Sequence, residues 1–333
     1  DLRMSRGLGD VYKRQFYDSI GLLSIGILRK PYKFYHSEAL QSIGIECIIE
    51  LSEIHRDGSG VKMTMMEKKT YKVMTFNMRN ANGKDGINAF SFREPRIREM
   101  LAAEAPDIIG LQEAVNASRD WLREVLEPTY TLVGCGRESN YRGEGVPVAF
   151  RNDCFEMIGY DCFWLSPTPL IPGSVYENSD QSRYPRMVNI LRLKPREWDC
   201  PLTVINTHLD HIGKGARAME LTWLEQYISE NVSGFGVLTG DFNAVPQVPE
   251  MIDFTERMKA LGWTDATASF PTTFHGYRLE PPLKIDYIFT NCRWQDSRIV
   301  VDVPQNGVYY SDHQAVCTQI GLLPERTAEK SVE

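Results

Sequence analysis

From residue 71 onward, short apolar runs that end in polar residues recur along the chain. In most of them the residues either alternate between apolar and polar or are apolar throughout, which is typical of half-buried and fully buried β-strands. The pattern predicts strands over residues 71–77, 107–113, 130–134, 146–151, 155–165, 187–193, 202–206, 236–241, 285–290, 299–303 and 315–320.

Between some of these runs, apolar residues recur at the spacing of a helix instead. This spacing predicts helices within residues 97–105, 121–127, 216–229 and 249–261, and a proline follows directly after each of the first two. Strands and helices do not alternate regularly along the chain. We therefore expect an α/β protein with two packed sheets flanked by helices rather than a doubly wound parallel sheet.

The first 65 residues do not share this organisation. They contain basic and aromatic pieces and one apolar patch at residues 43–51, without a sustained helix or strand period. We expect residues 1–65 to be a poorly ordered extension or a segment foreign to the native product, not a second domain. Met66 resembles a natural initiator, so residues 66–323 are predicted to form the domain and residues 324–333 a polar C-terminal tail.

Composition limits the classes of function. The chain has 333 residues, of which 42% are hydrophobic, which is enough for one large core. Its formal net charge of -7 argues against a protein that grips nucleic acid or a membrane through a broad basic surface. A local basic site remains compatible with this charge.

Cysteine usage and hydropathy bear on the compartment. The seven cysteines are scattered and form no C-x-x-C pair. This pattern indicates reduced thiols in a cytoplasmic protein, and neither a disulfide framework nor a zinc cluster. The apolar run at residues 20–28 is too short to span a bilayer, so we expect no membrane association.

Residues 236–243, GVLTGDFN, show how a strand of this chain ends. Val237 and Leu238 are typical of a buried strand, so Asp241 and Asn243 should emerge together at its carboxyl end. One interpretation is an Asx-type turn, in which both side chains bond only to nearby backbone. The other is a functional site, because an unpaired carboxylate at a sheet rim is costly.

Other predicted strands end in residues of the same kind. The set comprises Asn77, Glu113, Glu144, His208, Asp241, Asn243, Asp286, Asp312 and His313. All are oxygen or imidazole donors, which suit a hard cation such as Mg²⁺ or Mn²⁺ together with groups that titrate near neutral pH. Each alone is more often a solvated strand end or a loop residue than a catalytic one. Their joint occurrence at successive strand ends favours phosphoester hydrolysis.

Six short motifs carry a family resemblance. They are FNMR at residues 76–79, LQE at 111–113, NTHLDH at 206–211, GDFN at 240–243, IDYIF at 285–289 and SDH at 311–313. In this order they resemble the endonuclease/exonuclease/phosphatase superfamily, and an uncharacterised bacterial branch of it in particular. The resemblance covers residues 71 to about 320 and implies a four-layered α/β sandwich of two packed mixed β-sheets flanked by helices.

The resemblance also implies roles for individual residues. Glu113 resembles the principal metal ligand, with Asn77 at both the metal and the substrate phosphate and Asp312 near the metal. Asp241 resembles the carboxylate that orients or deprotonates the attacking water. Asn243 then holds the phosphate beside it, and His313 is a catalytic histidine oriented by Asp286.

Further roles follow from less constant segments of the family. His208 resembles a second catalytic histidine, paired in the deoxyribonuclease branch with a glutamate that corresponds to Glu144. Arg186 resembles an arginine that faces the scissile phosphate, and Arg79 one that approaches the substrate backbone. Asp210 and His211 either widen the metal site or order their loop, and the latter is preferred.

The sequence therefore predicts a Mg²⁺- or Mn²⁺-dependent phosphoesterase that hydrolyses a phosphodiester with a metal-assisted water molecule. Its partner is a phosphoester substrate, with nucleic acid and nucleotides among the candidates, and no obligate protein partner is inferred. The acidic balance favours a small or flexible substrate over long duplex DNA. The alternatives are a phosphomonoesterase acting on a sugar or inositol phosphate and a catalytically inactive binding module of the same fold.

Overall fold

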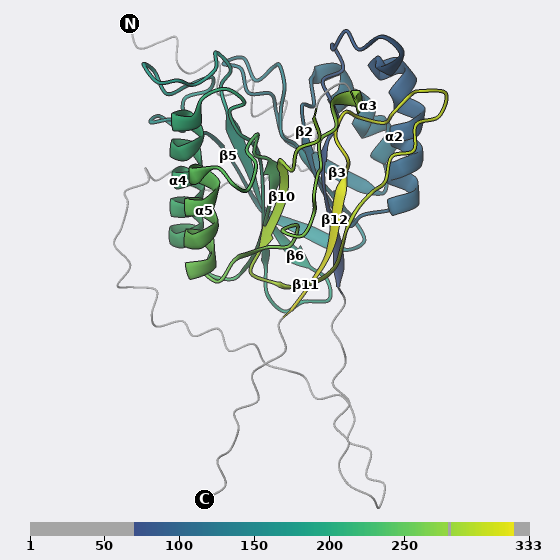
Figure 1. The fold of residues 1–333 in the computed structure, drawn as a ribbon. Coiled ribbons are helices and arrows are strands. Elements are labelled where there is room, and N and C mark those ends of the chain that lie inside the picture. Colours follow the sequence, from purple (N-terminus) through teal and green to yellow (C-terminus); the bar gives the residue numbers. More distant parts are fainter. Residues whose placement is uncertain (1–69, 279–280, 323–333) are drawn as a thin grey trace, which may run out of the picture. The chain divides into compact units, whose positions relative to one another are not determined.

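The computed structural model of the chain describes residues 70–278 and 281–322. The extension expected at residues 1–65 and the tail expected at residues 324–333 both lie outside the described residues. The described part is made up of strands and helices joined by loops (Figure 1).

Most strands and helices overlap the predicted ranges, but the helix expected from residue 97 begins at Phe90, and the strands at residues 264–265 and 293–299 were not predicted. The strands are β1 (Tyr71–Asn77), β2 (Ile108–Gln112), β3 (Tyr130–Val133), β4 (Val148–Arg151), β5 (Phe155–Trp164), β6 (Met187–Pro195), β7 (Leu202–His208), β8 (Phe235–Asp241), β9 (Thr264–Asp265), β10 (Asp286–Thr290), β11 (Arg293–Ile299) and β12 (Val316–Gly321). The α-helices are α2 (Phe90–Glu104), α3 (Asn116–Leu126), α4 (Lys214–Asn231) and α5 (Pro249–Ala260), and η1 (Gly86–Asn88) and η2 (Gly276–Arg278) are short 3₁₀ turns.

Proline marks several helix boundaries. Helix α2 ends at Ala105, which takes a left-handed conformation with φ of 41° and donates its N–H to Leu101 O. Pro106 follows directly and disfavours continuation of the helix. Helix α5 instead begins at Pro249, where the missing N–H would have had no partner within the helix.

The strands form two mixed six-stranded sheets within the described residues. The strand orders are β11-β12-β1-β2-β4-β3 and β5-β6-β7-β8-β10-β9. Strands β1 and β2 are parallel, as are β7 and β8, and the other neighbours are antiparallel. The central pair β1 and β2 faces β8 and β7 of the other sheet. The carboxyl ends of these four strands therefore meet at one rim of the domain.

Three apolar clusters hold four layers together. The first lies between the sheets and includes Val73, Ile108 and Val204. The second packs one sheet against α2 and α3, and the third packs the other sheet against α4 and α5. Figure 1 shows α4 and α5 on one side of the strands and α2 and α3 on the opposite side. The expected four-layered α/β sandwich is confirmed.

A buried polar cluster joins the two sheets beneath the carboxyl ends of the central strands. Asn206 on β7 donates through Nδ2 to Leu111 O at 2.8 Å, and its Oδ1 accepts from Gln112 Nε2 at 2.8 Å and from Thr239 Oγ1 at 3.0 Å. At Gly110 a Cβ would come within 2.2 Å of Thr239 Oγ1, so a glycine is required there for the sheets to approach. This cluster fixes the position of one sheet's strand ends against the other's.

The prediction of a strand at residues 299–303 is wrong. The structure places the edge strand β11 at Arg293–Ile299, where it pairs with β12 around a register shift between Gln295 and Arg298. The reason is that β11 is largely exposed and carries polar residues, so it has no apolar pattern to reveal it. Val301 and Val303, which suggested a strand, are exposed.

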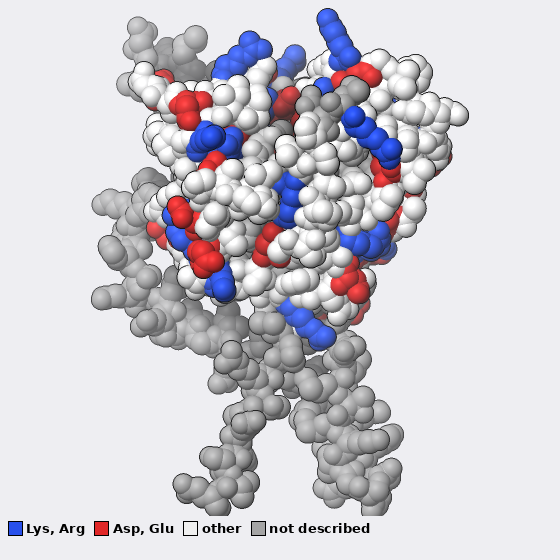
Figure 2. Space-filling model, in the orientation of Figure 1, with Lys and Arg blue, Asp and Glu red and all other residues white. Residues whose placement is uncertain are grey.

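Charged side chains of both signs are mixed on the face of the molecule in Figure 2. On the face drawn in Figure 2, basic and acidic side chains of the described residues are interspersed without a broad basic area. No helix in the described part of the chain is long and apolar enough to cross a membrane.

Candidate active site

Strand register places three of the predicted residues side by side. His208 at the end of β7 is the Cα partner of Asp241 on β8, and Asp241 is the partner of Asp286 on β10. In the other sheet, Asn77 at the end of β1 pairs with Gln112 on β2, directly before Glu113. The polar residues at the strand ends of one sheet thus face those of the other sheet.

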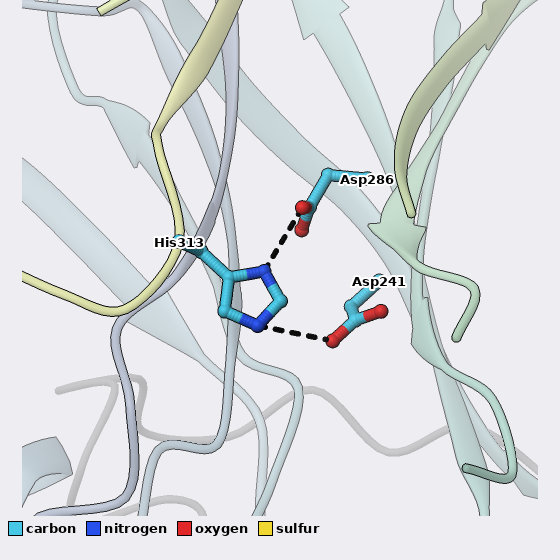
Figure 3. A group of neighbouring side chains, drawn as sticks. All are labelled: Asp241, Asp286 and His313. Atoms are coloured by element: carbon cyan, nitrogen blue, oxygen red, sulfur yellow. Dashed lines mark hydrogen bonds and ion pairs between the residues drawn. The ribbon is translucent and has the colours of Figure 1, made fainter. Parts of the chain in front are cut away.

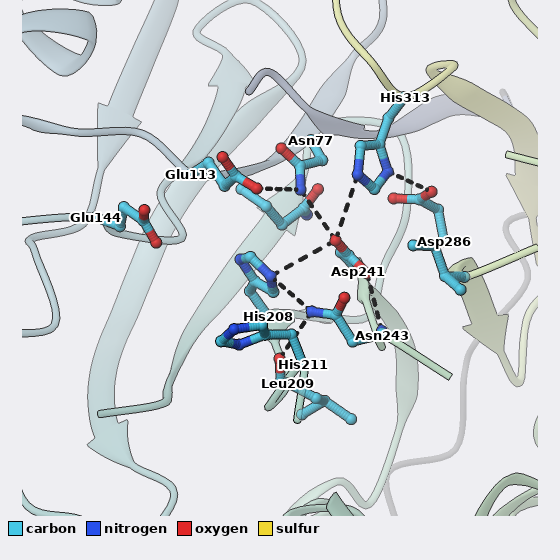
Figure 4. Close-up of polar contacts among 12 residues, drawn as sticks. Asn77, Glu113, Glu144, His208, Leu209, His211, Asp241, Asn243, Asp286 and His313 are labelled. Carbon is cyan, nitrogen blue, oxygen red and sulfur yellow. Dashed lines mark hydrogen bonds and ion pairs between the residues drawn. The ribbon is translucent and has the colours of Figure 1, made fainter. Parts of the chain in front are cut away.

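Asp241 is the meeting point of these groups (Figure 4). Its Oδ2 accepts from Asn77 Nδ2 at 2.9 Å and lies 3.5 Å from His208 Nε2 and 3.7 Å from His313 Nε2. Its Oδ1 accepts from the backbone N–H of Asn243 at 2.9 Å. The Asx-type turn is therefore present, but it occupies one oxygen while the other faces the predicted site. Burial raises the pKa of Asp241.

His313 is held between two carboxylates (Figure 3). Its Nδ1 lies 2.9 Å from Asp286 Oδ2, and its Nε2 points to Asp241. Burial opposes a charge on the ring, but Asp286 and Asp241 outweigh it and raise the pKa of His313 to about 10. The free protein therefore carries an imidazolium here at neutral pH.

The second histidine has the opposite tendency. Burial, followed by the nearby cations Arg186 and Arg137, holds the pKa of His208 well below its usual range. The amide Nδ2 of Asn243 lies 2.9 Å from His208 Nε2, so that ring nitrogen is the acceptor. The two histidines are thus distinguished by their surroundings, one charged and one neutral.

Glu113 is displayed on a strained backbone. It has φ of 59°, and Arg79 and Asn243 nearby have φ of 57° and 50°. A left-handed conformation is uncommon outside glycine and clusters at functional sites. Asn77 Nδ2 donates to Glu113 Oε1 at 3.1 Å, and the backbone N–H of Asn80 donates to Oε2 at 2.7 Å.

Glu144 does not pair with His208 in the described structure. It accepts from Asn80 Nδ2 at 2.6 Å through Oε1 and forms a 2.6 Å ion pair with Arg137 through Oε2. The loop at residues 134–147 directs Glu144 toward these partners, so Glu144 and His208 share only the lining of one small cavity. The pairing that the sequence suggested is replaced by the contact with Arg137.

Arg79 lies among acidic side chains, with Asp85, Asp312 and Glu113 near it. The Arg79 guanidinium makes two hydrogen bonds to Asp85, at 3.1 and 2.9 Å, and its Nε lies 3.7 Å from Asp312 Oδ2. The contact with Asp85, which outweighs burial, raises the pKa of Arg79 further above its usual value. Arg79 is therefore already paired on one side.

Asp210 orders its loop, as the sequence favoured. Its side chain is fully buried and accepts from the backbone N–H groups of Ile212 and Gly213 at 2.9 and 2.7 Å. It also lies 3.4 Å from Arg186 Nε, and Arg186 Nη2 donates to His211 Nδ1 at 2.8 Å. Asp210 and His211 thus position Arg186.

Two sets of residues have the chemistry to hold a metal ion. Asp241, Asp286 and His313 offer ligand atoms within 4.8 Å of one another, a group that could hold a metal. Both ring nitrogens of His313 face carboxylates, however, so a metal there would have to displace its proton. Glu113 and Asp312 instead offer carboxylate oxygens, and Asn77 offers an amide oxygen that accepts from the backbone N–H of Arg79 at 3.0 Å; oxygens are the donors that Mg²⁺ and Mn²⁺ prefer. Each Glu113 oxygen accepts one hydrogen bond among the described residues.

Several contributors were not singled out by the sequence. Asn80 contacts both Glu113 and Glu144, Arg137 pairs with Glu144, and Thr273 Oγ1 accepts from the backbone N–H of Asp286 at 3.0 Å. Two of these residues could have been found from their place in the sequence, because Arg137 shares a polar loop with Glu144 and Asn80 follows the FNMR motif. Thr273 gave no local signal.

A buried carboxyl group behind the site supports a prediction on stability. Glu220 on α4 is fully buried and accepts from the backbone N–H of Asp210 at 2.9 Å through Oε2, while Oε1 has no partner among the described residues. Burial raises the pKa of Glu220 to about 7. Because the pKa of Glu220 is higher in the folded protein than in the unfolded chain, its neutral form contributes to the free energy of unfolding. That contribution is complete below pH ~4.5 and is lost as the pH rises through about 7.

Glu220→Gln should therefore raise the free energy of unfolding at pH 8 by about 1–3 kcal/mol, with a smaller gain at pH 5. The amide stays neutral and still presents an oxygen to Asp210 N. Urea unfolding at the two pH values measures the change, with the exposed Glu230→Gln on the same helix as the control. A gain that does not depend on pH would contradict the assignment.

Comparisons with known proteins give one family match. The model of the Endonuclease/Exonuclease/phosphatase family matches residues 74–313 of the chain, a range that includes Asn77 and His313. No curated protein sequence matches.

Solved structures share the fold along nearly their whole length. An endonuclease/exonuclease/phosphatase from Bacteroides vulgatus is 27% identical with a TM-score of 0.69, and the match covers 77% of this chain and 100% of that one. A family protein from Bacteroides thetaiotaomicron is 25% identical with a TM-score of 0.69, covering 78% and 97%. A mannosyl-6-phosphatase from Bacteroides thetaiotaomicron is 25% identical with a TM-score of 0.64, covering 75% and 99%.

Proposed function

The chain belongs to the endonuclease/exonuclease/phosphatase family, and from this premise we propose that it is a Mg²⁺- or Mn²⁺-dependent hydrolase of phosphoesters. The observation that carries the proposal is the position of Asp241 Oδ2, which faces Asn77, His208 and His313 at the rim where both sheets end. A carboxylate surrounded in this way is suited to bind and deprotonate water beside an anionic substrate.

Each group has a role that its surroundings support. A water oxygen forms the new bond to phosphorus, and the bond to the leaving oxygen breaks with its electron pair passing to that oxygen, which takes a proton from solvent. Asp241 receives a proton from the attacking water, and its raised pKa improves it as a base. The charged ring of His313, oriented by Asp286, stabilises negative charge that develops on the phosphoryl group.

The remaining groups bind and orient. Asn77 orients Asp241 through its side-chain amide and Asn243 does so through its backbone N–H. Both asparagines are proposed to lie at the phosphoryl group, and Arg186 to supply positive charge. Glu113, Asn77 and Asp312 are the residues proposed to hold the divalent ion, which would supply Lewis-acid neutralisation of phosphate charge. Glu144 and Arg79 are proposed to act through their neighbours, because each is already paired with another side chain.

Two ester classes are candidates for the substrate. The sequence favours a phosphodiester, through resemblance to the deoxyribonuclease-like members. A phosphomonoester of a sugar is the second candidate, and it is supported by the likeness to a mannosyl-6-phosphatase over most of the domain.

The test is turnover by the full-length protein with Mg²⁺ or Mn²⁺. We expect hydrolysis of at least one of p-nitrophenyl phosphate, bis(p-nitrophenyl) phosphate and a short single-stranded oligonucleotide, followed by the release of nitrophenol or of shorter fragments. EDTA should abolish the activity, and excess Mg²⁺ should restore it. Substrate binding without turnover of any ester under any of these conditions would instead indicate an inactive binding module.

A further inference from the structure

A small cavity beside His208 contains two arginines. It has a volume of about 10 Å³ and is lined by Arg137, Glu144, Arg186 and His208, with backbone and apolar neighbours. A cavity of roughly 10–15 Å³ holds about one water molecule. The space therefore accommodates a single oxygen atom and not a larger group.

Arg186 has an unused donor at this cavity. Its side chain is 2% exposed, and its Nε and Nη2 contact Asp210 and His211. Its Nη1 is buried and has no hydrogen-bond partner among the described residues. A buried guanidinium nitrogen without an acceptor is costly, so an oxygen in the cavity would satisfy it.

Arg137 adds a second cation that is held in a fixed position. It forms a 2.6 Å ion pair with Glu144, its guanidinium carbon lies 4.7 Å from the centre of the Tyr184 ring, and its side chain is 9% exposed. Both arginines act on His208, where together with burial they hold its pKa low. The cavity, of the size of one oxygen, therefore holds two guanidinium groups next to His208, and each is also paired with a carboxylate, Arg137 with Glu144 and Arg186 with Asp210.

We propose that the cavity between Arg137 and Arg186 binds one terminal oxygen of the substrate's phosphoryl group, and that it makes the enzyme prefer phosphomonoesters. An unesterified oxygen of either ester class fits a cavity of this size, so the preference arises from charge. A monoester has three terminal oxygens and close to two negative charges at neutral pH, whereas a diester has two such oxygens and one charge. Two buried arginines favour the more highly charged group. The proposal rests on the proposed function and assigns Arg137 as a specificity-determining residue.

A purely structural role for Arg137 is the rival explanation. Arg137 also joins the loop at residues 134–147 to Tyr184, so its removal could loosen both segments. Such loosening would reduce hydrolysis of monoesters and diesters alike and would lower the melting temperature. A specificity role would separate the two substrates.

The chain provides a matched control on the same tyrosine. The guanidinium carbon of Arg183 lies 4.9 Å from the Tyr184 ring centre, and Arg183 Nη2 donates to Tyr184 Oη at 2.7 Å. Arg183 is exposed and does not line the cavity. Arg183→Met therefore removes the same charge from the other neighbour of Tyr184.

The experiment compares kcat/KM for p-nitrophenyl phosphate and bis(p-nitrophenyl) phosphate in the full-length protein. Arg137→Met should lower the monoester value about 100-fold, as loss of a charge-stabilising donor does, and the diester value by less than about 10-fold. Arg137→Lys should recover part of the loss, and Arg183→Met should leave both values unchanged. The concentration of inorganic phosphate that gives half-maximal inhibition should be roughly 10-fold higher for Arg137→Met than for the unchanged protein.

Two outcomes would overturn the inference. One is an equal loss on both esters in Arg137→Met, and the other is an unchanged protein that hydrolyses diesters in preference to monoesters. In both, metal-dependent turnover would persist, so the proposed function would stand. Absence of turnover on every ester would instead remove the proposed function itself.

Discussion

His313→Ala is expected to lower kcat by about 1,000-fold on whichever ester the protein hydrolyses, with a smaller effect on KM. The change removes the imidazolium that lies 3.7 Å from Asp241 Oδ2 and 2.9 Å from Asp286 Oδ2. Charge that develops on the phosphoryl group then loses one protein cation at this rim. An effect confined to kcat is what an interaction made mainly in the transition state produces.

Two further variants sharpen this prediction. Asp286→Asn keeps the side-chain shape but removes the charge that supports the imidazolium, so it should lower kcat by about 10- to 100-fold. His275→Ala is the control, because His275 is another partly buried histidine whose ring nitrogens have no hydrogen-bond partner among the described residues. Steady-state kinetics and melting temperatures of the three variants would be compared. Equal losses in His275→Ala and His313→Ala would argue against the assigned role.

Glu113→Gln is expected to raise the Mg²⁺ concentration needed for half-maximal activity by more than about 100-fold, since changes to outer-shell partners alone cost 10–100-fold in metal affinity. The amide keeps the oxygen that Asn77 Nδ2 contacts but loses the negative charge that draws a hard cation. Activity measured across a Mg²⁺ titration gives the shift directly, and saturating Mg²⁺ should recover part of the rate.

The same titration separates the two possible metal sites. Glu144→Gln is the matched control, because Asn80 contacts both glutamates and Glu144 is not among the proposed ligands. It should alter the rate without altering the Mg²⁺ requirement. If Asp286→Asn shifts the Mg²⁺ requirement and Glu113→Gln does not, the ion is held by Asp241, Asp286 and His313.

Much of the fold was predictable because its core strands are apolar and its turns are well marked. The strand ending at Asn77 and the one ending at Asp241 have the predicted ends. Strand β11 was misplaced because an exposed edge strand needs no apolar face, and its pairing with β12 is all that defines it. Helix α4 buries Arg217 and Glu220, which a pattern of apolar residues does not reveal.

The same division applies to the site. The resemblance pointed to His313 and Asp286 as a pair, and the structure brings them to 2.9 Å. It also suggested that Glu144 contacts His208, and here the loop takes another path, toward Arg137 and Asn80. Loop conformation depends on contacts made far away in the sequence, so a motif inside a loop constrains it less than a motif at a strand end.

By itself, the sequence determined which residues end the central strands and that their chemistry is carboxylate, amide and imidazole. It did so because side-chain periodicity and strand punctuation are local properties. The tertiary structure decided which of these ends meet. The register of β7, β8 and β10 aligns His208, Asp241 and Asp286, and the buried contacts of Asn206 hold the other sheet's Asn77 and Glu113 opposite them. Register and sheet packing are set by long-range pairing, which no local pattern encodes.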